Sequence, residues 1–260
     1  MTVNRFWQEI FGQGIVRTTG DFGVMGDQPS HPELLDWLAF RFMEQGESVK
    51  ALHRLIVTSA AYRQVSDFGR GAESSSDGQN RFLWRMNRAR LDAEQFHDAL
   101  LAVSGNLDLS MGGPSVREFA FKDDHSPVYD YGRYDRDSPG ANRRSIYRFI
   151  VRSVPDPFME ALDCPDANTL TPVRNVTTTA LQALATLNDA FVLRQCEVFA
   201  ARLARERGDL AGQVDRAFEL ALNRAPSATE RATVSAHARR HGMASACRIL
   251  FNSNEFLFID

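Results

Sequence analysis

Cysteine is scarce in this chain of 260 residues: there are three, Cys164, Cys196 and Cys247. An odd number at wide spacing argues against a disulfide framework and leaves room for one bridge at most. None lies in a CxxC or CxxCH pattern, so neither a Cys-based zinc site of ordinary spacing nor covalently attached c-type haem is expected. We therefore predict no cofactor in this chain.

Excess charge and long apolar runs are absent as well. Lys and Arg number 30 against 33 Asp and Glu, a net charge of -3, which lacks the basic footprint of nucleic-acid binding. No run reaches the roughly 20 apolar residues that cross a bilayer. The N-terminus also lacks the basic-then-apolar order of a signal peptide. Neither a nucleic-acid partner nor membrane insertion is expected.

Familiar catalytic motifs are missing too. There is no G-x-S-x-G, and the glycines between residues 12 and 26 fit neither dinucleotide-binding nor P-loop spacing. His31 follows this glycine loop and is a candidate general base because histidine titrates near neutrality. The alternative is that His31 orders the loop through hydrogen bonds. Asp21 of the loop and Glu94 are the other catalytic candidates.

Apolar residues recurring every three or four positions predict a mainly α, multi-helix globular domain. Pairs fitting the capping box, Ser30 with Glu33, Thr179 with Gln182 and Ser227 with Glu230, mark three helix starts. The aromatic residues Phe6, Trp7, Phe11, Trp37, Phe40 and Phe42 are expected mostly in the core. Helices are predicted near 3–12, 31–45, 48–62, 79–86, 92–104, 180–187, 190–206, 210–223, 228–240 and 243–252. Glycines that would end three of these helices are Gly46, Gly105 and Gly242.

Between about 105 and 175 the helical period fades, which predicts a long irregular insertion with at most a small β element. The strand candidate is Ser145–Val151, rich in β-branched and aromatic residues. Residues 67–77, rich in Gly and Ser, are the expected mobile surface loop. We expect one domain over 1–260, with a helical part at 1–104, the insertion at 105–175 and a second helical part at 176–260.

Two histidine spacings resemble parts of metal sites. Glu94 and His97, with Asp98 adjacent, match half of a helical di-iron site, but no second Glu-x-x-His exists in the chain. His237 and His241 are four apart without an evident third ligand. Charged helix faces explain both patterns, and we predict no metal.

Two groups of residues are candidates for ligand binding. The first is an acidic and aromatic loop with Asp130, Asp135 and Tyr131, a composition suited to calcium or a sugar unless neighbouring basic residues pair with the acids. The second is a concentration of arginines including Arg144, Arg148 and Arg174, with Asn175 leading into a helix start that suits an anion. The alternative for Arg174 is a pair with Asp163 or Asp166. The ligand-binding candidates are thus Arg144, Arg148, Arg174, Asn175, Asp130, Asp135 and Tyr131.

Short sequence segments spread along the whole chain resemble those of one known family. They include Asn4-Arg5-Phe6-Trp7, His31-Pro32-Glu33-Leu34-Leu35-Asp36-Trp37, Arg143-Arg144-Ser145-Ile146-Tyr147, Asp156-Pro157-Phe158, Arg174-Asn175-Val176-Thr177-Thr178 and Leu250-Phe251-Asn252-Ser253-Asn254-Glu255-Phe256. Together they resemble the bacterial domain of unknown function number 1553, abundant in planctomycete-type bacteria.

The resemblance implies a C-terminal domain that follows a second uncharacterised domain, and often a cytochrome-c-like domain, in an exported protein. Haem would then belong only to the separate upstream domain. Because the chain opens on a helix already under way, it reads as part of something longer. The expected role is an accessory or binding domain of an exported periplasmic or envelope protein, docking on the upstream domain and related to carbohydrate. The alternative is a catalytic domain, a hydrolase or oxidoreductase acting on polysaccharide.

Overall fold

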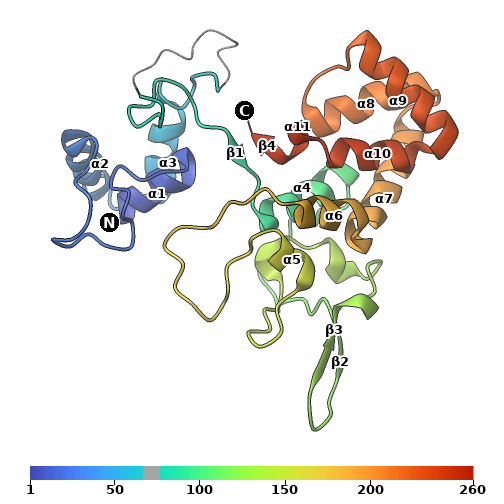
Figure 1. Ribbon diagram of the computed structural model, residues 1–260, viewed down its shortest axis with the longest axis horizontal. Helices are drawn as coiled ribbons and strands as arrows, with labels where there is room; N and C mark the ends of the chain where they lie inside the picture. Colours follow the sequence, from blue (N-terminus) through green and yellow to red (C-terminus); the bar gives the residue numbers. More distant parts are fainter. Residues whose placement is uncertain (67–76, 260) are drawn as a thin grey trace. The chain divides into compact units, whose positions relative to one another are not determined.

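The computed structural model describes residues 1–66 and 77–259. The chain divides into two compact units, unit 1 with Met1–Ala89 and Ile259, and unit 2 with Arg90–Phe258. Figure 1 shows the elements of each. Except for Asp77, the expected surface loop at 67–77 lies outside the described residues.

The described residues of unit 1 form three helices, α1 (Thr2–Phe11), α2 (Pro32–Glu44) and α3 (Val49–Val57). The α1 helix buries Trp7 and Phe11, which with Leu38 of α2 and Leu52 of α3 belong to one hydrophobic core. The buried amide of Asn4 donates to the carbonyl of Val16 at 3.0 Å and accepts its N–H at 2.8 Å. This pair of bonds fixes the loop after α1 against the helix.

Unit 2 is the larger unit, and its core is built mainly from helices near its C-terminal end. Phe96, Phe199 and Phe251 are among its fully buried side chains. Its α-helices are α4 (Ala93–Ser104), α5 (Pro157–Ala161), α6 (Ala180–Asn188), α7 (Ala190–Glu206), α8 (Leu210–Leu222), α9 (Ala228–His241), α10 (Met243–Phe251) and α11 (Asn254–Leu257). The mainly α fold expected from the periodicity is confirmed.

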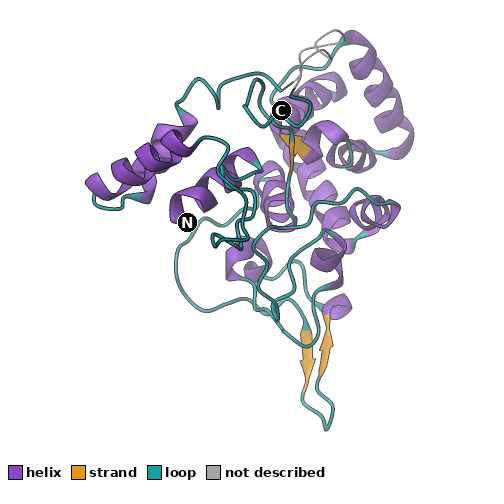
Figure 2. Cartoon of the chain, turned by 60° about the vertical axis from the view of Figure 1, so that its left-hand side comes forward, coloured by secondary structure: helices purple, strands orange, loops and turns teal. Residues whose placement is uncertain are grey.

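Between α4 and α6 the chain is largely irregular, as expected, and its strands are short (Figure 2). The antiparallel hairpin of β2 (Ala120–Lys122) and β3 (Val128–Asp130) pairs Phe121 with Tyr129. Three 3-10 turns follow: η1 (Tyr131–Arg133), η2 (Pro139–Asn142) and η3 (Ser145–Tyr147). A second two-stranded sheet pairs β1 (Ala89–Arg90) with β4 (Phe258–Ile259).

The strand predicted at Ser145–Val151 is wrong. The segment begins with η3, and its β-type pairing is one isolated bridge between Arg148 and Val116. The backbone N–H of Ser145 donates to the carboxylate of Asp98 at 2.7 Å. A side chain that takes a backbone donor in this way competes with strand formation.

The helix predicted at 79–86 is also wrong, because Asp77 accepts the N–H groups of Arg81 and Phe82 that a helix would use. Asn80 and Leu83 have φ values of 51° and 52°, a left-handed conformation that interrupts a helix. The helix expected over 48–62 ends early, at Val57.

Two of the three predicted capping boxes are confirmed, at Thr179 and Ser227. The box at Ser30 is wrong because α2 begins at Pro32, which makes His31 the N-cap and leaves Ser30 one residue too early. Gly105 caps α4 in the left-handed conformation at φ 88°, as predicted. Trp7 is buried as expected, but Trp37 and Phe40 are 47% and 61% exposed, so their core assignment is wrong.

All three cysteines are free, in line with the absence of a disulfide framework. Burial raises the pKa of the Cys196 thiol to about 12, which leaves it protonated at neutral pH. No helix in the described part of the chain is both long and apolar enough to cross a membrane.

Candidate functional site

The site with the most concentrated chemistry is a cavity of about 240 Å³ in unit 2, here called the Arg148 pocket. It lies where the irregular segment meets the starts of α5 and α7. Its lining combines charged groups with aromatic rings, and its residues are His97, Glu118, Tyr131, Gly132, Tyr134, Arg136, Ala141, Arg148, Asp156, Pro157, Phe158, Asp189 and Phe191.

Arg148 forms the charged centre of the pocket between two carboxylates. Its Nε donates to Glu118, and its Nη2 donates to Asp156 Oδ2 at 2.5 Å. Burial alone would lower the pKa of Arg148, but the two carboxylates outweigh this and raise it above its ordinary value. The guanidinium is therefore held flat and permanently charged, with its positive charge balanced inside the pocket.

Local folding explains why these distant residues meet. The bridge between Val116 and Arg148 brings Glu118 alongside the guanidinium. Asp156 is the N-cap of α5, and its Oδ1 accepts the N–H of Phe158 at 2.8 Å. One carboxylate thus caps a helix with one oxygen and binds Arg148 with the other.

Aromatic rings enclose the charged centre. The Tyr131 hydroxyl donates to the carbonyl of Val154 at 2.8 Å, which fixes its ring. Tyr134 accepts a hydrogen bond from Ser138 at 3.0 Å. Burial raises the pKa of both tyrosines, so both are neutral hydroxyls at physiological pH. The Phe158 and Phe191 rings lie 6.2 Å apart between centroids.

Asp189 adds a second kind of carboxylate to the pocket. It is the N-cap of α7 and accepts the N–H of Phe191 at 2.7 Å. Burial raises its pKa although this bond opposes the shift. Its environment therefore differs from that of the two carboxylates that bind Arg148.

His97 lines the pocket and is almost fully buried. Its Nδ1 is 3.1 Å from Asp98 Oδ1 and 2.9 Å from Ser145 Oγ, and its ring stacks on Phe191 at 4.4 Å. The hydroxyl of Ser145 and the carboxylate of Asp98 both lie at Nδ1. A nucleophile triad needs them on opposite ring nitrogens, so this cluster is not one.

Of the predicted ligand-binding residues, Arg148 and Tyr131 line this pocket and the others lie elsewhere. Arg174 binds Glu94 through two bonds, 2.6 and 3.0 Å long, and not Asp163 or Asp166. Asp163 instead binds Arg90 at 3.1 Å. Glu94, one of the catalytic candidates, is thus an ion-pair partner. Burial alone would raise the pKa of Glu94, but its bonds to Arg174 outweigh burial and hold the pKa below its ordinary value.

The remaining candidates make local interactions. Arg144 lies 3.9 Å from Asp98, and Asp130 caps η1 and is 3.4 Å from Arg133. Asp135 accepts the N–H of Asp137 at 3.0 Å, and Asn175 is exposed. The predicted candidates therefore do not gather in one site, and the acidic loop enters the Arg148 pocket through Tyr131 and its neighbours Gly132 and Tyr134 and not through Asp130 or Asp135.

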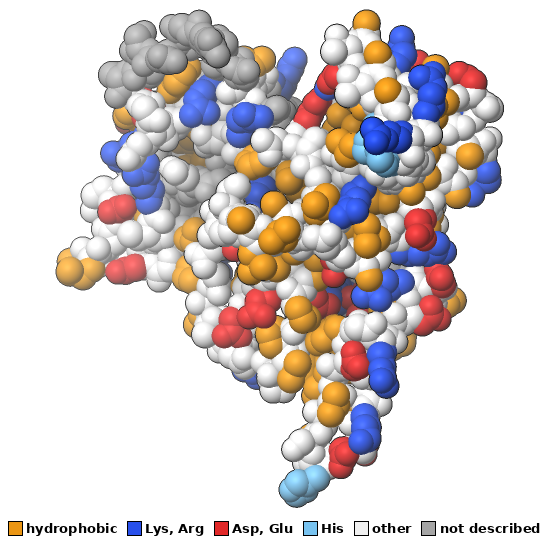
Figure 3. All heavy atoms as spheres, turned by 45° about the vertical axis from the view of Figure 1, so that its right-hand side comes forward, with side chains coloured by type: hydrophobic (Ala, Val, Ile, Leu, Met, Phe, Trp, Pro, Cys, Tyr) orange, Lys and Arg blue, Asp and Glu red, His pale blue; other side chains and the backbone are white. Residues whose placement is uncertain are grey.

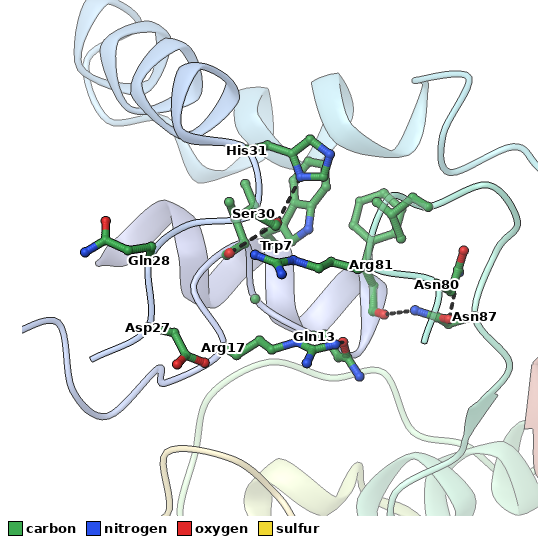
Figure 4. A pocket seen from close by; sticks show the side chains of 14 residues that line it. Trp7, Gln13, Arg17, Asp27, Gln28, Ser30, His31, Asn80, Arg81 and Asn87 are labelled. Atoms are coloured by element: carbon green, nitrogen blue, oxygen red, sulfur yellow. Dashed lines mark hydrogen bonds between the residues drawn. The ribbon is translucent and has the colours of Figure 1, made fainter. Parts of the chain in front are cut away.

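A second cavity of about 310 Å³, the Trp7 pocket, lies within unit 1. Figure 4 shows Trp7 at its base, with the side chains of Arg17 and Arg81 extending across it. His31 lines it, with Nδ1 bonded to Ser30 Oγ at 2.9 Å. Asp21 does not line it, and its carboxylate accepts the N–H of Gly23 instead. Two of the catalytic candidates therefore do not share a site.

Glu118, Asp156 and Asp189 line the Arg148 pocket but are not among the candidates that the sequence predicts. The available signals were the helix starts, since Asp156 precedes a proline and Asp189 precedes an apolar helical run, both N-cap patterns. The spacing of Glu94 and His97 resembles half of a metal site, but the sequence predicts no metal there. Among the described residues no cluster of three His, Cys, Asp or Glu side chains could hold a metal ion, and His237 Nε2 bonds Ser245 at 2.8 Å.

The comparisons with known proteins identify a family without assigning an activity. The model of the family PSD1, described as protein of unknown function DUF1553, matches residues 1–238. No curated protein and no solved structure matches the chain.

Proposed function

Because the chain belongs to the DUF1553 family, whose description gives no function, its role must be inferred from its residues, and we propose a binding domain whose Arg148 pocket takes a neutral saccharide. The observation that carries this proposal is the guanidinium of Arg148, fixed between Glu118 and Asp156 inside an aromatic enclosure. Planar polar groups exchange hydrogen bonds with sugar hydroxyls, while aromatic rings pack on the apolar faces of sugars.

The balance of charge favours a neutral ligand. The carboxylates of Glu118 and Asp156 offset the guanidinium of Arg148, so no excess positive charge is left to hold an anion. The cavity of about 240 Å³ suits one sugar ring or two. As the family resemblance suggests, the parent protein would be exported and would present this pocket to envelope polysaccharide.

Isothermal titration of the purified chain with cellobiose, maltose, lactose and N,N′-diacetylchitobiose tests this proposal. We expect millimolar or tighter binding of at least one disaccharide, weakened about tenfold by Phe158→Ala because a stacking surface is lost. The matched control is Phe121→Ala on the exposed hairpin, which should bind as the parent chain does. Failure of all four disaccharides to bind would contradict the proposal.

A second candidate function is hydrolysis of a polysaccharide, and Asp189 is the observation that favours it. A buried carboxyl with a raised pKa can act as general acid, while a carboxylate in an ion pair stays charged. Release of reducing ends from soluble glucans and chitosan would establish this activity, and Asp189→Asn should abolish it. Binding without any product would leave the domain as a binding module.

We also propose a protein-docking face on α6, for the upstream domain that the resemblance implies. This helix buries Gln182 and Thr186 but leaves Leu181 and Leu184 66% and 56% exposed, the reverse of the usual arrangement. Figure 3 shows that hydrophobic side chains are exposed at the surface. An exposed apolar stripe of this kind marks an interaction surface.

Size-exclusion chromatography with light scattering tests the docking face. The apolar stripe without its partner should cause concentration-dependent self-association, and the double change Leu181→Ser with Leu184→Ser should abolish it. The matched control is Leu109→Ser, an exposed leucine outside α6. A strictly monomeric parent chain at high concentration would argue against this surface.

A further inference from the structure

The imidazole of His97 is almost fully buried, with 4% of the residue exposed, yet half of its hydrogen-bonding capacity is unused. Nδ1 lies between Asp98 Oδ1 and Ser145 Oγ. In the described part of the chain Nε2 has no hydrogen-bond partner, and His97 lines the Arg148 pocket. Nε2 is not one of the fully buried side-chain atoms that lack a hydrogen-bond partner in the described residues, so it is open to the pocket, where a ligand or water can complete it.

Asp98 determines which ring nitrogen carries the proton. Its Oδ1 accepts the N–H of Ser145 at 2.7 Å and the hydroxyl of Ser145 at 2.7 Å. Burial alone would raise the pKa of Asp98, but the hydrogen bonds from His97 and Ser145 outweigh it and hold the pKa below its ordinary value. An ionised Asp98 can only accept, so a neutral His97 must place its proton on Nδ1.

We infer that His97 presents an unprotonated Nε2 to the Arg148 pocket, as an oriented acceptor for a hydroxyl of the bound saccharide, with Asp98 as its positioning residue. Nε2 accepts a hydrogen bond without carrying charge, and its ring is fixed by Asp98 and Phe191, so it selects a hydroxyl at one position of the sugar. The identity of the ligand rests on the proposed saccharide binding, whereas the position of the proton on the His97 ring does not.

The sign of the pH effect follows from this arrangement. Protonation converts Nε2 from an acceptor into a donor, so saccharide binding should be weaker at acid pH than at pH 8. The charged and titratable groups that face the ring or share its pocket are Asp98, Arg144, Glu118, Arg148, Asp156, Asp189, Arg136, Tyr131 and Tyr134. Of the carboxylates only Asp98 bonds to the ring.

Nuclear magnetic resonance of the ligand-free chain, labelled with ¹⁵N in histidine, tests the ring itself. Long-range proton–nitrogen correlations near pH 8 should show a protonated Nδ1 and an unprotonated Nε2 for His97. The change Asp98→Ala should mix the two tautomers, while Asp98→Asn, which keeps an oxygen acceptor, should preserve the parent pattern. A protonated Nε2 in the parent chain would overturn the inference whether or not any disaccharide binds.

Titration with the four disaccharides tests the role of Nε2 in binding. The amide of Gln reaches the position of Nε2, whereas that of Asn reaches only the position of Nδ1. His97→Asn should therefore weaken binding about five- to tenfold, equivalent to one hydrogen bond, and His97→Gln should restore most of it without the pH dependence. Equal affinity of the parent chain and His97→Asn at pH 8 would overturn the role in binding.

Failure of the proposed function gives a different pattern. If none of the four disaccharides binds the parent chain, saccharide recognition fails and so does the proposed ligand contact. The correlation spectrum still decides whether His97 is an oriented acceptor. Binding that is present but indifferent to both His97 variants would leave the proposed function standing and reject the inference alone.

Discussion

At the scale of single residues, the ion pairs of unit 2 differ widely in how far they are exposed to water. The side chains of Arg148 and Glu118 are each 13% exposed, whereas that of Arg133, which pairs with Asp130, is 83% exposed. Interactions between exposed charges are screened by water, and those between buried charges are not. The two pairs should therefore respond very differently to mutation.

Replacing Arg148 by Met should leave Glu118 and Asp156 as unpaired buried carboxylates. We expect a loss of about 3 kcal/mol in the free energy of unfolding, measured by urea denaturation. Arg148→Lys keeps the charge but not the two-sided geometry and should cost less. The control Arg133→Met should change stability by less than about 0.5 kcal/mol. Similar losses for both arginines would show that the buried pairing is not formed.

The acid sensitivity of the chain should depend on two carboxylates of its C-terminal helices. Hydrogen bonds from Arg202 and Arg216 lower the pKa of Glu206 to about 2, and those from Arg224 and Ser227 do the same for Glu230. Their ordinary value is 4.5. Because the folded state holds these groups ionised, their contribution is present above pH 4.5 and is lost as pH falls toward 2.

Unfolding midpoints measured between pH 7 and pH 3 test this expectation. Glu206→Gln and Glu230→Gln should each lower the midpoint at pH 7 and flatten its fall with acid, and Gln at 230 still completes the capping box. The control is Glu9→Gln, an exposed residue of α1. Parallel pH profiles for all the variants and the parent chain would refute the assignment.

At the scale of the elements, the local sequence predicted a helix start wherever the capping side chain stood directly before the first helical residue and its partner three positions later. Thr179 Oγ1 accepts the N–H of Gln182 at 3.2 Å, and Gln182 returns a bond of 3.1 Å to the Thr179 N–H. Asp92 forms the same box with Gln95. The box expected at Ser30 failed because Pro32 set the start of α2 one residue later.

The capping box of α6 makes a direct prediction. Thr179→Ala should destabilise unit 2 by about 1 kcal/mol, since the N–H of Gln182 loses its acceptor, and Thr179→Ser should restore most of this. The neighbouring Thr178 is exposed and provides the matched control. Equal effects of Thr178→Ala and Thr179→Ala on the urea midpoint would mean that the cap does not stabilise the helix.

At the scale of the whole molecule, each unit buries its own hydrophobic residues. Trp7, Phe11 and Leu38 belong to the core of unit 1, while Phe96 and Phe199 belong to that of unit 2. The ends of unit 2 are joined by a hydrogen bond from the N–H of Leu91 to the carbonyl of Leu257 at 2.8 Å. These features are those of a part that folds by itself.

The segment 90–258 should therefore fold when produced alone. We expect a helical circular dichroism spectrum and a single cooperative urea transition, because its core residues all lie within the segment. The Thr179→Ala change should lower the midpoint of the segment and of the full chain by the same amount. A segment with helical signal but no cooperative transition would show that unit 2 needs the rest of the chain.

The sequence by itself determined what depends on neighbours a few residues apart. Apolar spacing gave the longer helices of both units but not the short α5 and α11, and the cap at Thr179 and the glycine end of α4 followed from local chemistry. The resemblance gave the family, which the match over residues 1–238 supports.

Tertiary structure decided everything that depends on residues far apart in the chain. Arg174 pairs with Glu94, 80 positions away in the sequence, and not with the nearer Asp163 or Asp166. Pairing depends on distance in space and not on distance along the chain. The carboxylate of Asp98 accepts the N–H of Ser145, and a 3-10 turn forms at Ser145–Tyr147 where the sequence predicted a strand. The Arg148 pocket likewise assembles α4, the irregular segment and the starts of two helices. No local pattern specifies that meeting, since packing of the whole of unit 2 brings these side chains together.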